Sequence, residues 1–251
     1  MFVIIFRRRS LLAAAGFLVV LALMLVAGRL TGLPVVSEHN LAQPVVGSKL
    51  LPLIQVDTSQ RALALTFDIS WGEVMPTQVL DVLKQEKVTA TFFCSGPWAK
   101  KHPDIVQRII ADGHQLASHG QAHVNYSGLT KAGVQANIAD SCAILKEITG
   151  RDIRYVRPPN GDYNDQAITA AAEKGVVLVT WSVDSLDWKN PGVETIQSRV
   201  LNKAHNGAIV LLHASDTCKQ THLALPTIIA GLRQKGFALL TLDQLLALKG
   251  K

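Results

Sequence analysis

The stretch ALTFDISWG, residues 64–72, places a carboxylate where an apolar run ends. The run begins at residue 61 as RALALTF and is almost continuously apolar, as expected for a strand that is covered on both faces. Asp68 follows the run at once, ahead of Ile69 and of a predicted helix over 75–87. The stretch therefore predicts a buried strand with one acidic side chain at its carboxyl end.

The same pattern recurs along the chain, in alternation with helix-like segments. Predicted strands cover 61–67, 88–96, 114–118, 153–158, 176–184, 208–215 and 237–242. Predicted helices cover 75–87, 102–113, 130–150, 164–175, 193–207, 223–236 and 242–250. Seven alternating units predict an α/β fold, either a (β/α) barrel or a doubly wound sheet. No glycine-rich phosphate loop follows the first strand, which argues against a nucleotide-binding sheet.

The amino-terminal part of the chain has the pattern of a membrane signal. Three arginines at 7–9 precede a run of 19 uncharged residues, 10–28, which is long enough to span a bilayer as a helix. We expect residues 1–9 to be cytoplasmic, 10–28 to be a transmembrane anchor, 29–56 to be a linker and 57–251 to be one extracytoplasmic domain. A cleaved signal over 1–28, which would give a secreted protein, is the alternative.

Charge and cysteine content exclude two further classes. Residues 1–56 hold five basic residues and one acidic residue, so they contribute +4 of the formal net charge of +6. The remainder is nearly neutral and has no concentrated basic stripe, which argues against a nucleic-acid partner. Three cysteines without a C-x-x-C pair do not form a disulfide scaffold.

Polar side chains with catalytic chemistry follow the predicted strands. Because the carboxyl ends of parallel strands meet on one rim, where barrel active sites lie, we expect these side chains to converge. They are Asp68, His119, His123, Arg157, Asp184, Asp187 and His213.

His119 and His123, in SHGQAH, form an H-x-x-x-H pair. Imidazole nitrogen suits zinc and other borderline divalent ions. An isolated pair of this kind would equally be two polar loop histidines. Its place at a strand end favours a metal site.

The other candidates have a structural and a functional interpretation each. His213 ends the apolar strand IVLLH and is either a structural histidine or a general acid. Arg157 forms either a rim salt bridge or a bidentate pair that holds a carboxylate. Asp184 or Asp187, in DSLDW, orients a histidine or pairs with Arg157. Trp188 belongs to the core or forms an apolar wall against a sugar or acyl group.

Taken in order, TFDIS, SHGQAH, RPPNG, DSLDW and LLH resemble the five motifs of the polysaccharide deacetylases, the NodB homology domain of carbohydrate esterase family four. The resemblance covers about 57–245, and the TFDISWG form is similar to the PdaB-like sporulation branch. It implies a distorted (β/α)7 barrel, which the expected amino-terminal transmembrane helix precedes in the chain. It also implies metal-assisted hydrolysis of acetyl groups on peptidoglycan or a related cell-wall glycan.

The resemblance further implies a divalent ion, zinc or another such as cobalt, held by His119 and His123. Such an ion polarises the acetyl carbonyl and binds the attacking water. Asp68 matches the family's catalytic base.

The remaining matches complete the implied site. Arg157 matches the residue that holds the base. His213 matches the general acid, and Asp187 matches the aspartate that supports it. The matches to pocket-lining positions are Trp188, Leu211 and Asn160, the last in place of the family's usual aromatic residue.

One departure from the family pattern affects the implied metal site. The usual motif is TFDDG, whose second aspartate is the third protein ligand, and here that position is Ile69. Asp68, Glu73 or Asp162 would have to compensate. The sequence therefore predicts a deacetylase with an altered metal site. The alternatives are an inactive glycan-binding or scaffolding protein of the same fold and a metal-independent hydrolase that uses Asp68 and His213.

Overall fold

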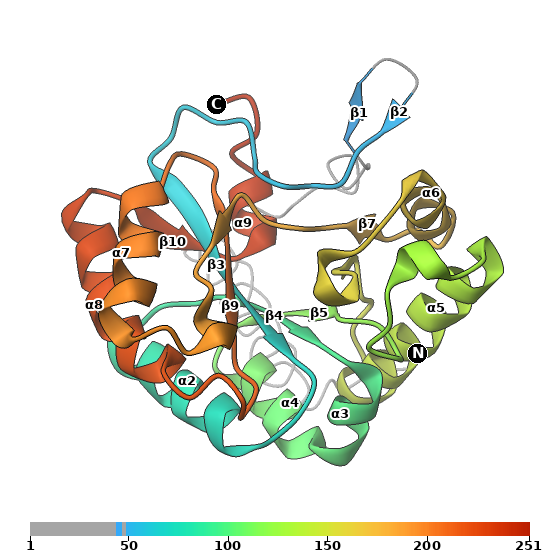
Figure 1. Cartoon of the computed structure of the whole chain (residues 1–251), viewed down its shortest axis with the longest axis horizontal. Coiled ribbons are helices and arrows are strands. Elements are labelled where there is room, and N and C mark those ends of the chain that lie inside the picture. Colours follow the sequence, from blue (N-terminus) through green and yellow to red (C-terminus); the bar gives the residue numbers. More distant parts are fainter. Residues whose placement is uncertain (1–43, 47–48) are drawn as a thin grey trace, which may run out of the picture. The chain divides into compact units, whose positions relative to one another are not determined.

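Strand β3, Ala62–Ile69, is an interior strand of a parallel sheet in the computed structural model, which describes residues 44–46 and 49–251 (Figure 1). Along the sheet the order is β7 (Val177–Leu178), β6 (Tyr155–Val156), β5 (Gln115–Ser118), β4 (Thr91–Cys94), β3, β9 (Ile209–His213) and β8 (Val183–Asp184). Strand β10, Ala238–Leu240, pairs with the first residues of β3. Every pairing in this sheet is parallel, as expected from the alternation of strands and helices.

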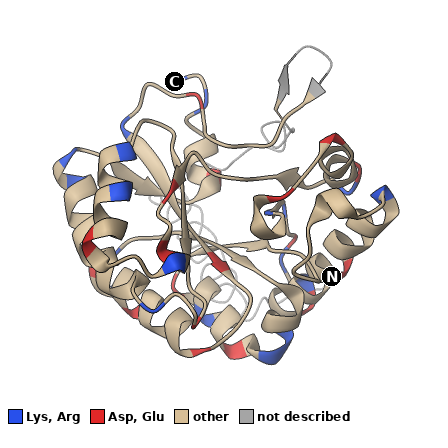
Figure 2. Cartoon of the chain, in the orientation of Figure 1, with Lys and Arg blue, Asp and Glu red and all other residues tan. Residues whose placement is uncertain are grey.

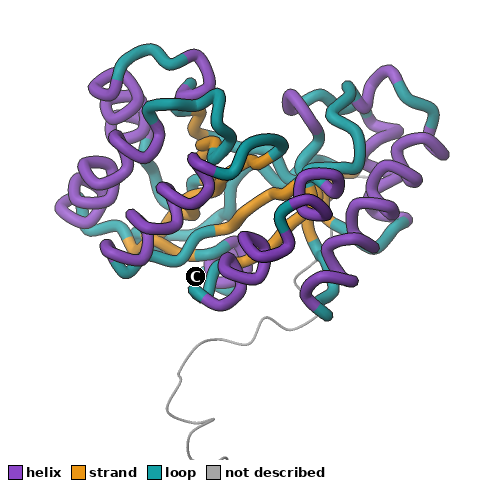
Figure 3. The backbone as a smooth tube through the Cα atoms, turned by 90° about the horizontal axis from the view of Figure 1, so that it is seen from below, coloured by secondary structure: helices purple, strands orange, loops and turns teal. Residues whose placement is uncertain are grey.

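Helices surround the strands and supply the outer apolar layer (Figure 3). They are α2 (Val74–Glu86), α3 (Gly96–Lys101), α4 (Pro103–Ala111), α5 (Lys131–Thr149), α6 (Asp165–Glu173), α7 (Val193–Lys203) and α8 (Thr221–Gln234), with α9 (Leu242–Leu246) near the carboxyl end of the chain. Local signals set several of their ends. The Asn164 side chain accepts from the Ala167 N–H and begins α6, and Gly150, at φ +68°, ends α5. Helix α3 lies in a segment for which the sequence predicted no helix.

One predicted strand, 176–184, is two strands in the structure. Strands β7 and β8 are consecutive in the chain but lie at opposite ends of the sheet order. Only residues 179–182 connect them, so the two edges of the sheet approach each other within reach of a few extended residues. The chain connects the two edges, but β7 and β8 do not pair with each other. The prediction of one strand over 176–184 is therefore wrong, and the barrel is open between β7 and β8.

The two faces of β3 separate the apolar core from the interior of the barrel. Leu63, Leu65, Phe67 and Ile69 belong to the cluster that packs under the helices. Burial of each such side chain contributes about 1.5–3 kcal/mol. Successive strand residues point to opposite faces, so Asp68 faces inward and Ile69 faces the helices.

The segment ahead of β3 is part of the fold and not part of a linker that ends at residue 56. Leu53 and Val56 are buried, Leu53 bridges to Val179, and the Val56 N–H donates to the Gly207 carbonyl at 2.8 Å. A Cβ at Gly207 would lie 1.7 Å from the Val56 carbonyl oxygen, so only glycine permits this approach. Leu53 and Val56 belong to the apolar cluster inside the barrel, which explains the correction. Ahead of them, β1 (Val45–Val46) and β2 (Lys49–Leu50) form a short antiparallel pair.

The predicted cytoplasmic end 1–9, anchor 10–28 and most of the linker lie outside the described residues. Within 44–46 and 49–251, no helix combines the length and apolar character needed to cross a membrane. Acidic and basic residues are interspersed over the outer helices (Figure 2). All three cysteines are free.

Candidate active site

Asp68 and Arg157 form a buried ion pair at the carboxyl ends of β3 and β6. Arg157 Nη1 donates to Asp68 Oδ1 at 2.7 Å, and Nη2 donates to Thr66 Oγ1 at 2.9 Å and to the Thr180 carbonyl at 3.1 Å. The guanidinium lies 4.1 Å from the centroid of the Phe93 ring. Burial alone would raise the pKa of Asp68, but the Arg157 guanidinium, together with His119 and His213, outweighs burial and lowers that pKa. Asp68 is therefore an anchored carboxylate whose Oδ2 remains outside the pair.

His119 and His123 lie beside Asp68 in the loop after β5. The His119 Nδ1–H donates to the Arg157 carbonyl at 3.0 Å, which leaves Nε2 as an unprotonated acceptor 3.7 Å from Asp68 Oδ2. Burial lowers the pKa of His119 to about 4, and partial desolvation lowers the pKa of His123. The ring centroids are 5.4 Å apart. Both rings are neutral at physiological pH, which is the form that binds a metal ion.

His213, at the end of β9, is held by a fully buried carboxylate. Asp187 Oδ1 accepts from His213 Nδ1 at 2.7 Å, and its Oδ2 accepts from the His213 backbone N–H and from Thr221 Oγ1, each at 2.7 Å. Burial by itself would lower the pKa of His213, but the Asp187 carboxylate, together with the charge of Asp68, reverses this and raises it. Asp187 thus favours a protonated imidazole at the cavity. The neighbouring Asp184 instead accepts from the Leu186 N–H.

The donor set around the histidine pair is incomplete for a three-ligand metal site. In the part of the chain that the structure describes, no three His, Cys, Asp or Glu side chains form a group able to hold an ion. Ile69 is fully buried on the helix side of β3. The residues present fit an ion held by two neutral imidazoles with the Asp68 carboxylate beside them. They do not fit the three protein ligands that catalytic zinc usually has.

Neither of the other carboxylates that the sequence offered as a substitute ligand reaches the pair. Glu73 lies beside His102, with 3.5 Å between Oε2 and Nδ1. Asp162 accepts from the backbone N–H and the hydroxyl of Ser127. Their own partners hold these carboxylates elsewhere, so Asp68 alone stays close to the histidine pair.

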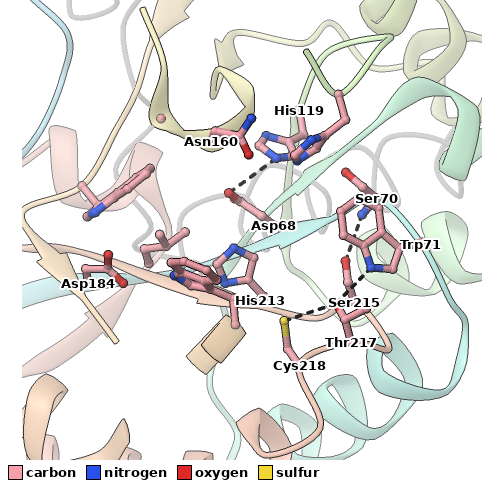
Figure 4. Close-up of a pocket in the computed structure, with 15 residues that line it drawn as sticks. Asp68, Ser70, Trp71, His119, Asn160, Asp184, His213, Ser215, Thr217 and Cys218 are labelled. Carbon is pink, nitrogen blue, oxygen red and sulfur yellow. Dashed lines mark hydrogen bonds and ion pairs between the residues drawn. The ribbon is translucent and has the colours of Figure 1, made fainter. Parts of the chain in front are cut away.

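These groups surround a cavity of 430 Å³, within the usual range of ligand pockets (Figure 4). The predicted residues that line it are Asp68, His119, His123, Asn160, Asp184, Trp188, Leu211 and His213. Arg157 and Asp187 lie behind this lining and have no exposed surface. Asn160 has a left-handed backbone, at φ +59°, and its side chain donates to Asn125.

Sequence reasoning missed part of the lining. Ser70, Trp71, Trp181, Ser215, Thr217 and Cys218 also face the cavity. Ser70 and Trp71 follow the end of β3, and the other three polar residues follow the end of β9. The expectation that active-site residues follow strand ends, which pointed to Asp68 and His213, would have found them too. Trp181 had no such signal, because it lies in the connection that closes the barrel.

Comparison with known proteins gives this arrangement a family. The family model described as polysaccharide deacetylase matches residues 55–179. The chitooligosaccharide deacetylase of Sinorhizobium fredii is 34% identical over 201 residues, which cover 74% of this chain and 93% of that protein. The chain belongs to the polysaccharide deacetylase family. Members of this family are hydrolases that act on the amide bonds of acetylated glycans.

Two further relatives come from Bacillus. A peptidoglycan-N-acetylglucosamine deacetylase of Bacillus cereus is 33% identical over 198 residues, which cover 78% of this chain and 92% of that protein. The protein YlxY of Bacillus subtilis is 30% identical over 195 residues, and the match covers 78% of this chain. The chain spans 60% of the length of YlxY.

Solved structures of polysaccharide deacetylases share the fold and include an inactive member. A pseudoenzyme of the family from Bacillus anthracis is 28% identical with a TM-score of 0.75, and the match covers 79% of this chain and 70% of that one. A mutant of that pseudoenzyme with restored enzymatic activity is 29% identical, also with a TM-score of 0.75, over 79% of this chain and 72% of that one. The predicted family and the parallel α/β barrel are therefore confirmed, while the catalytic role of each residue stays a prediction.

Proposed function

We propose that this protein is an N-deacetylase of an acetylated cell-wall glycan such as peptidoglycan, with an altered metal site. The observation that carries the proposal is that one cavity contains a carboxylate paired with an arginine and an imidazole paired with a carboxylate. The Arg157-held carboxylate of Asp68 lies on one strand, and the Asp187-held imidazole of His213 lies on the adjacent strand. One group is held in its basic form and the other in its acidic form, as amide hydrolysis requires.

In this proposal Asp68 Oδ2 accepts a proton from water as the water oxygen attacks the acetyl carbonyl. Arg157 keeps Asp68 ionised and fixes its orientation. As the C–N bond breaks, His213 donates its Nε2 proton to the leaving amine, and acetate is the second product. Leu211 and the half-exposed Trp188 form the apolar wall against which the acetyl group and the sugar pack. His119 and His123 would hold a divalent ion, which when bound would act as a Lewis acid towards the carbonyl.

The finer parts of the proposal rest on the sequence. The arginines at 7–9 and the uncharged run 10–28 support a domain that lies outside the cell, anchored in the membrane or released by cleavage. The TFDISWG motif supports a role in sporulation. Fractionation of cells that express the full chain, with and without residues 1–28, tests the location. Residence of the full chain in the cytosol would contradict it.

A second function is favoured by one observation, the fully buried Ile69. With no third ligand, the same fold would bind glycan without hydrolysing it, as a scaffold. The likeness to a pseudoenzyme supports this alternative.

The deciding experiment measures acetate release from peptidoglycan fragments and chitooligosaccharides, with added Zn²⁺ or Co²⁺ and with a chelator. The proposal expects metal-dependent release that is lost in Asp68→Asn and in His213→Ala and is retained in Leu223→Ala, a change of an exposed apolar residue on α8. Release that is unchanged by chelation would favour the metal-independent hydrolase.

Ile69→Asp separates the enzyme from the scaffold, with Ile69→Asn as its uncharged control. Release from Ile69→Asp alone, while the wild-type protein only binds saccharide, would assign the wild type to the scaffold class. Thermal unfolding of both variants shows whether the buried polar group leaves the domain folded.

A further inference from the structure

Trp71 is a large apolar side chain at the cavity with no role in the proposed chemistry. It follows Ser70 in the loop between β3 and α2, lines the cavity and remains 43% exposed. Single exposed apolar residues are common and need no explanation. What distinguishes Trp71 is the number of contacts that hold its ring in one position.

The indole ring is held on two sides. Its Nε1–H donates to Thr217 Oγ1 at 3.0 Å, a contact to the loop after β9 (Figure 4). Its ring meets the His123 ring edge to face, with 5.3 Å between centroids. An indole that is fixed in advance loses little rotational freedom on binding, so contacts to its exposed face contribute more to affinity.

The backbone beneath the ring is held as well. The Asp216 N–H donates to the Trp71 carbonyl at 3.3 Å, and the Trp98 indole donates to the Gly72 carbonyl at 2.6 Å. Gly72 has a left-handed backbone, at φ +84°, and a Cβ there would overlap the Asp216 carboxyl carbon at 2.1 Å. The loop therefore presents Trp71 as a rigid platform and not as a mobile flap.

The position of Trp71 separates it from the reacting centre. His123 lies against Trp71, His119 lies against His123, and His119 lies 3.7 Å from Asp68. Figure 4 shows Trp71 and Asp184 on opposite sides of Asp68. A glycan chain that lies in the cavity at Asp68 and continues towards the indole therefore passes the histidine pair.

We propose that Trp71 is a sugar-binding platform for a second residue of the glycan chain, next to the one that presents its acetyl group to Asp68 and His213. A pyranose ring exposes C–H groups on one face, and these pack on the flat, electron-rich face of an indole. Thr217 positions the platform through its hydrogen bond to Nε1. The inference rests on the glycan substrate of the proposed function and makes the protein selective for oligomers over single sugars.

The test measures binding without catalysis. Protein in chelating buffer is titrated with N-acetylglucosamine and its dimer, trimer and tetramer, and the Trp71 indole N–H signal is followed by NMR, assigned with Trp71→Phe. Affinity for wild-type protein is expected to rise between the single sugar and the longer oligomers, with a shift of the Trp71 signal. Trp71→Ala is expected to weaken oligomer binding about three- to tenfold and to leave single-sugar binding unchanged.

Trp71→Phe keeps an aromatic face and is expected to lose less. Thr217→Val is expected to weaken oligomer binding, because it frees the ring, whereas Leu223→Ala is expected to change nothing. Oligomer binding that is unaffected in Trp71→Ala, or wild-type protein that binds no oligomer better than the single sugar, would overturn the inference.

Acetate release, measured on the same variants with added Zn²⁺ or Co²⁺, separates this result from the proposed function. Chain-length selectivity that depends on Trp71 without acetate release supports the platform and rejects the catalysis. Acetate release with the same chain-length preference in wild type and Trp71→Ala supports the catalysis and rejects the platform.

Discussion

Asp187 has no exposed surface, and the hydrogen bonds of its carboxylate go to His213 and Thr221. Its charge is what reverses the effect of burial on the imidazole. Arg157 acts on Asp68 with the opposite sign, so these two buried residues favour the protonation states of the acid and the base that we propose.

We expect Asp187→Asn to lower the pKa of His213, because burial remains and the attracting charge is gone. The alkaline limb of the pH–rate profile should then move to lower pH, since the imidazole loses its proton earlier. An NMR titration of the His213 ring measures the pKa directly. Thr221→Val removes a neutral hydrogen bond and keeps the charge, so its His213 pKa should stay raised. An unchanged titration in Asp187→Asn would contradict the assignment of Asp187.

At the level of elements, helix α2 is capped by a residue from a distant loop. Its own first residues provide no side-chain cap. Instead the Asp216 carboxylate, from the loop between β9 and α8, accepts from the N–H groups of Glu73, Val74 and Met75, at 3.3, 3.4 and 2.7 Å. A negative charge at a helix amino terminus is also favourable for the helix dipole. This contact joins the two loops that carry Trp71 and Thr217.

We expect Asp216→Ala to reduce the free energy of unfolding by about 1–2 kcal/mol, the usual cost of a lost cap. Urea denaturation measures the loss. Asp216→Asn keeps an acceptor oxygen and should lose less. Asp104→Ala removes the same charge from the first turn of α4 and should change stability by less than about 0.5 kcal/mol. An equal effect of Asp104→Ala and Asp216→Ala would argue against the cap.

In the domain as a whole, the two ends of the strands have different roles. The cavity lies at the carboxyl ends, and structural polar contacts lie at the amino ends. His114, next to the start of β5, is buried, and its Nδ1 accepts from the Ala90 N–H at 3.1 Å. Acceptance requires a neutral ring, and burial lowers the pKa of His114 to about 4.

The sign of this shift predicts acid sensitivity for the entire domain. The unfolded chain binds a proton at His114 near pH 6.5 and the folded chain only near pH 4, so stability is present above 6.5 and is lost between these values. The loss from His114 between pH 7 and pH 5 should be about 2 kcal/mol. Urea unfolding of wild type and of His114→Asn, which keeps an acceptor, measures it. The variant should show a smaller loss, and an identical pH dependence would contradict the prediction.

The sequence by itself determined the features that depend on near neighbours in the chain. Apolar runs set the strands, glycine and asparagine set helix ends, and the polar residue after each run placed Asp68, His119 and His213 on one rim. The resemblance of five motifs anticipated the family. These signals were readable because period and capping are local properties of the backbone.

Only the tertiary structure shows how distant groups meet. The family resemblance implied that Arg157 holds Asp68 and that Asp187 supports His213, and the structure contains both contacts. The contact that fixes Trp71 to Thr217 had no signal in the sequence. The structure also placed residues 51–56 inside the fold and split 176–184 across the gap of the barrel. For the opening stretch, it directed Ile69 to the helices and Asp68 to the cavity. Contacts of this kind depend on long-range packing and on the closure of the sheet, and a local sequence pattern carries no information about either.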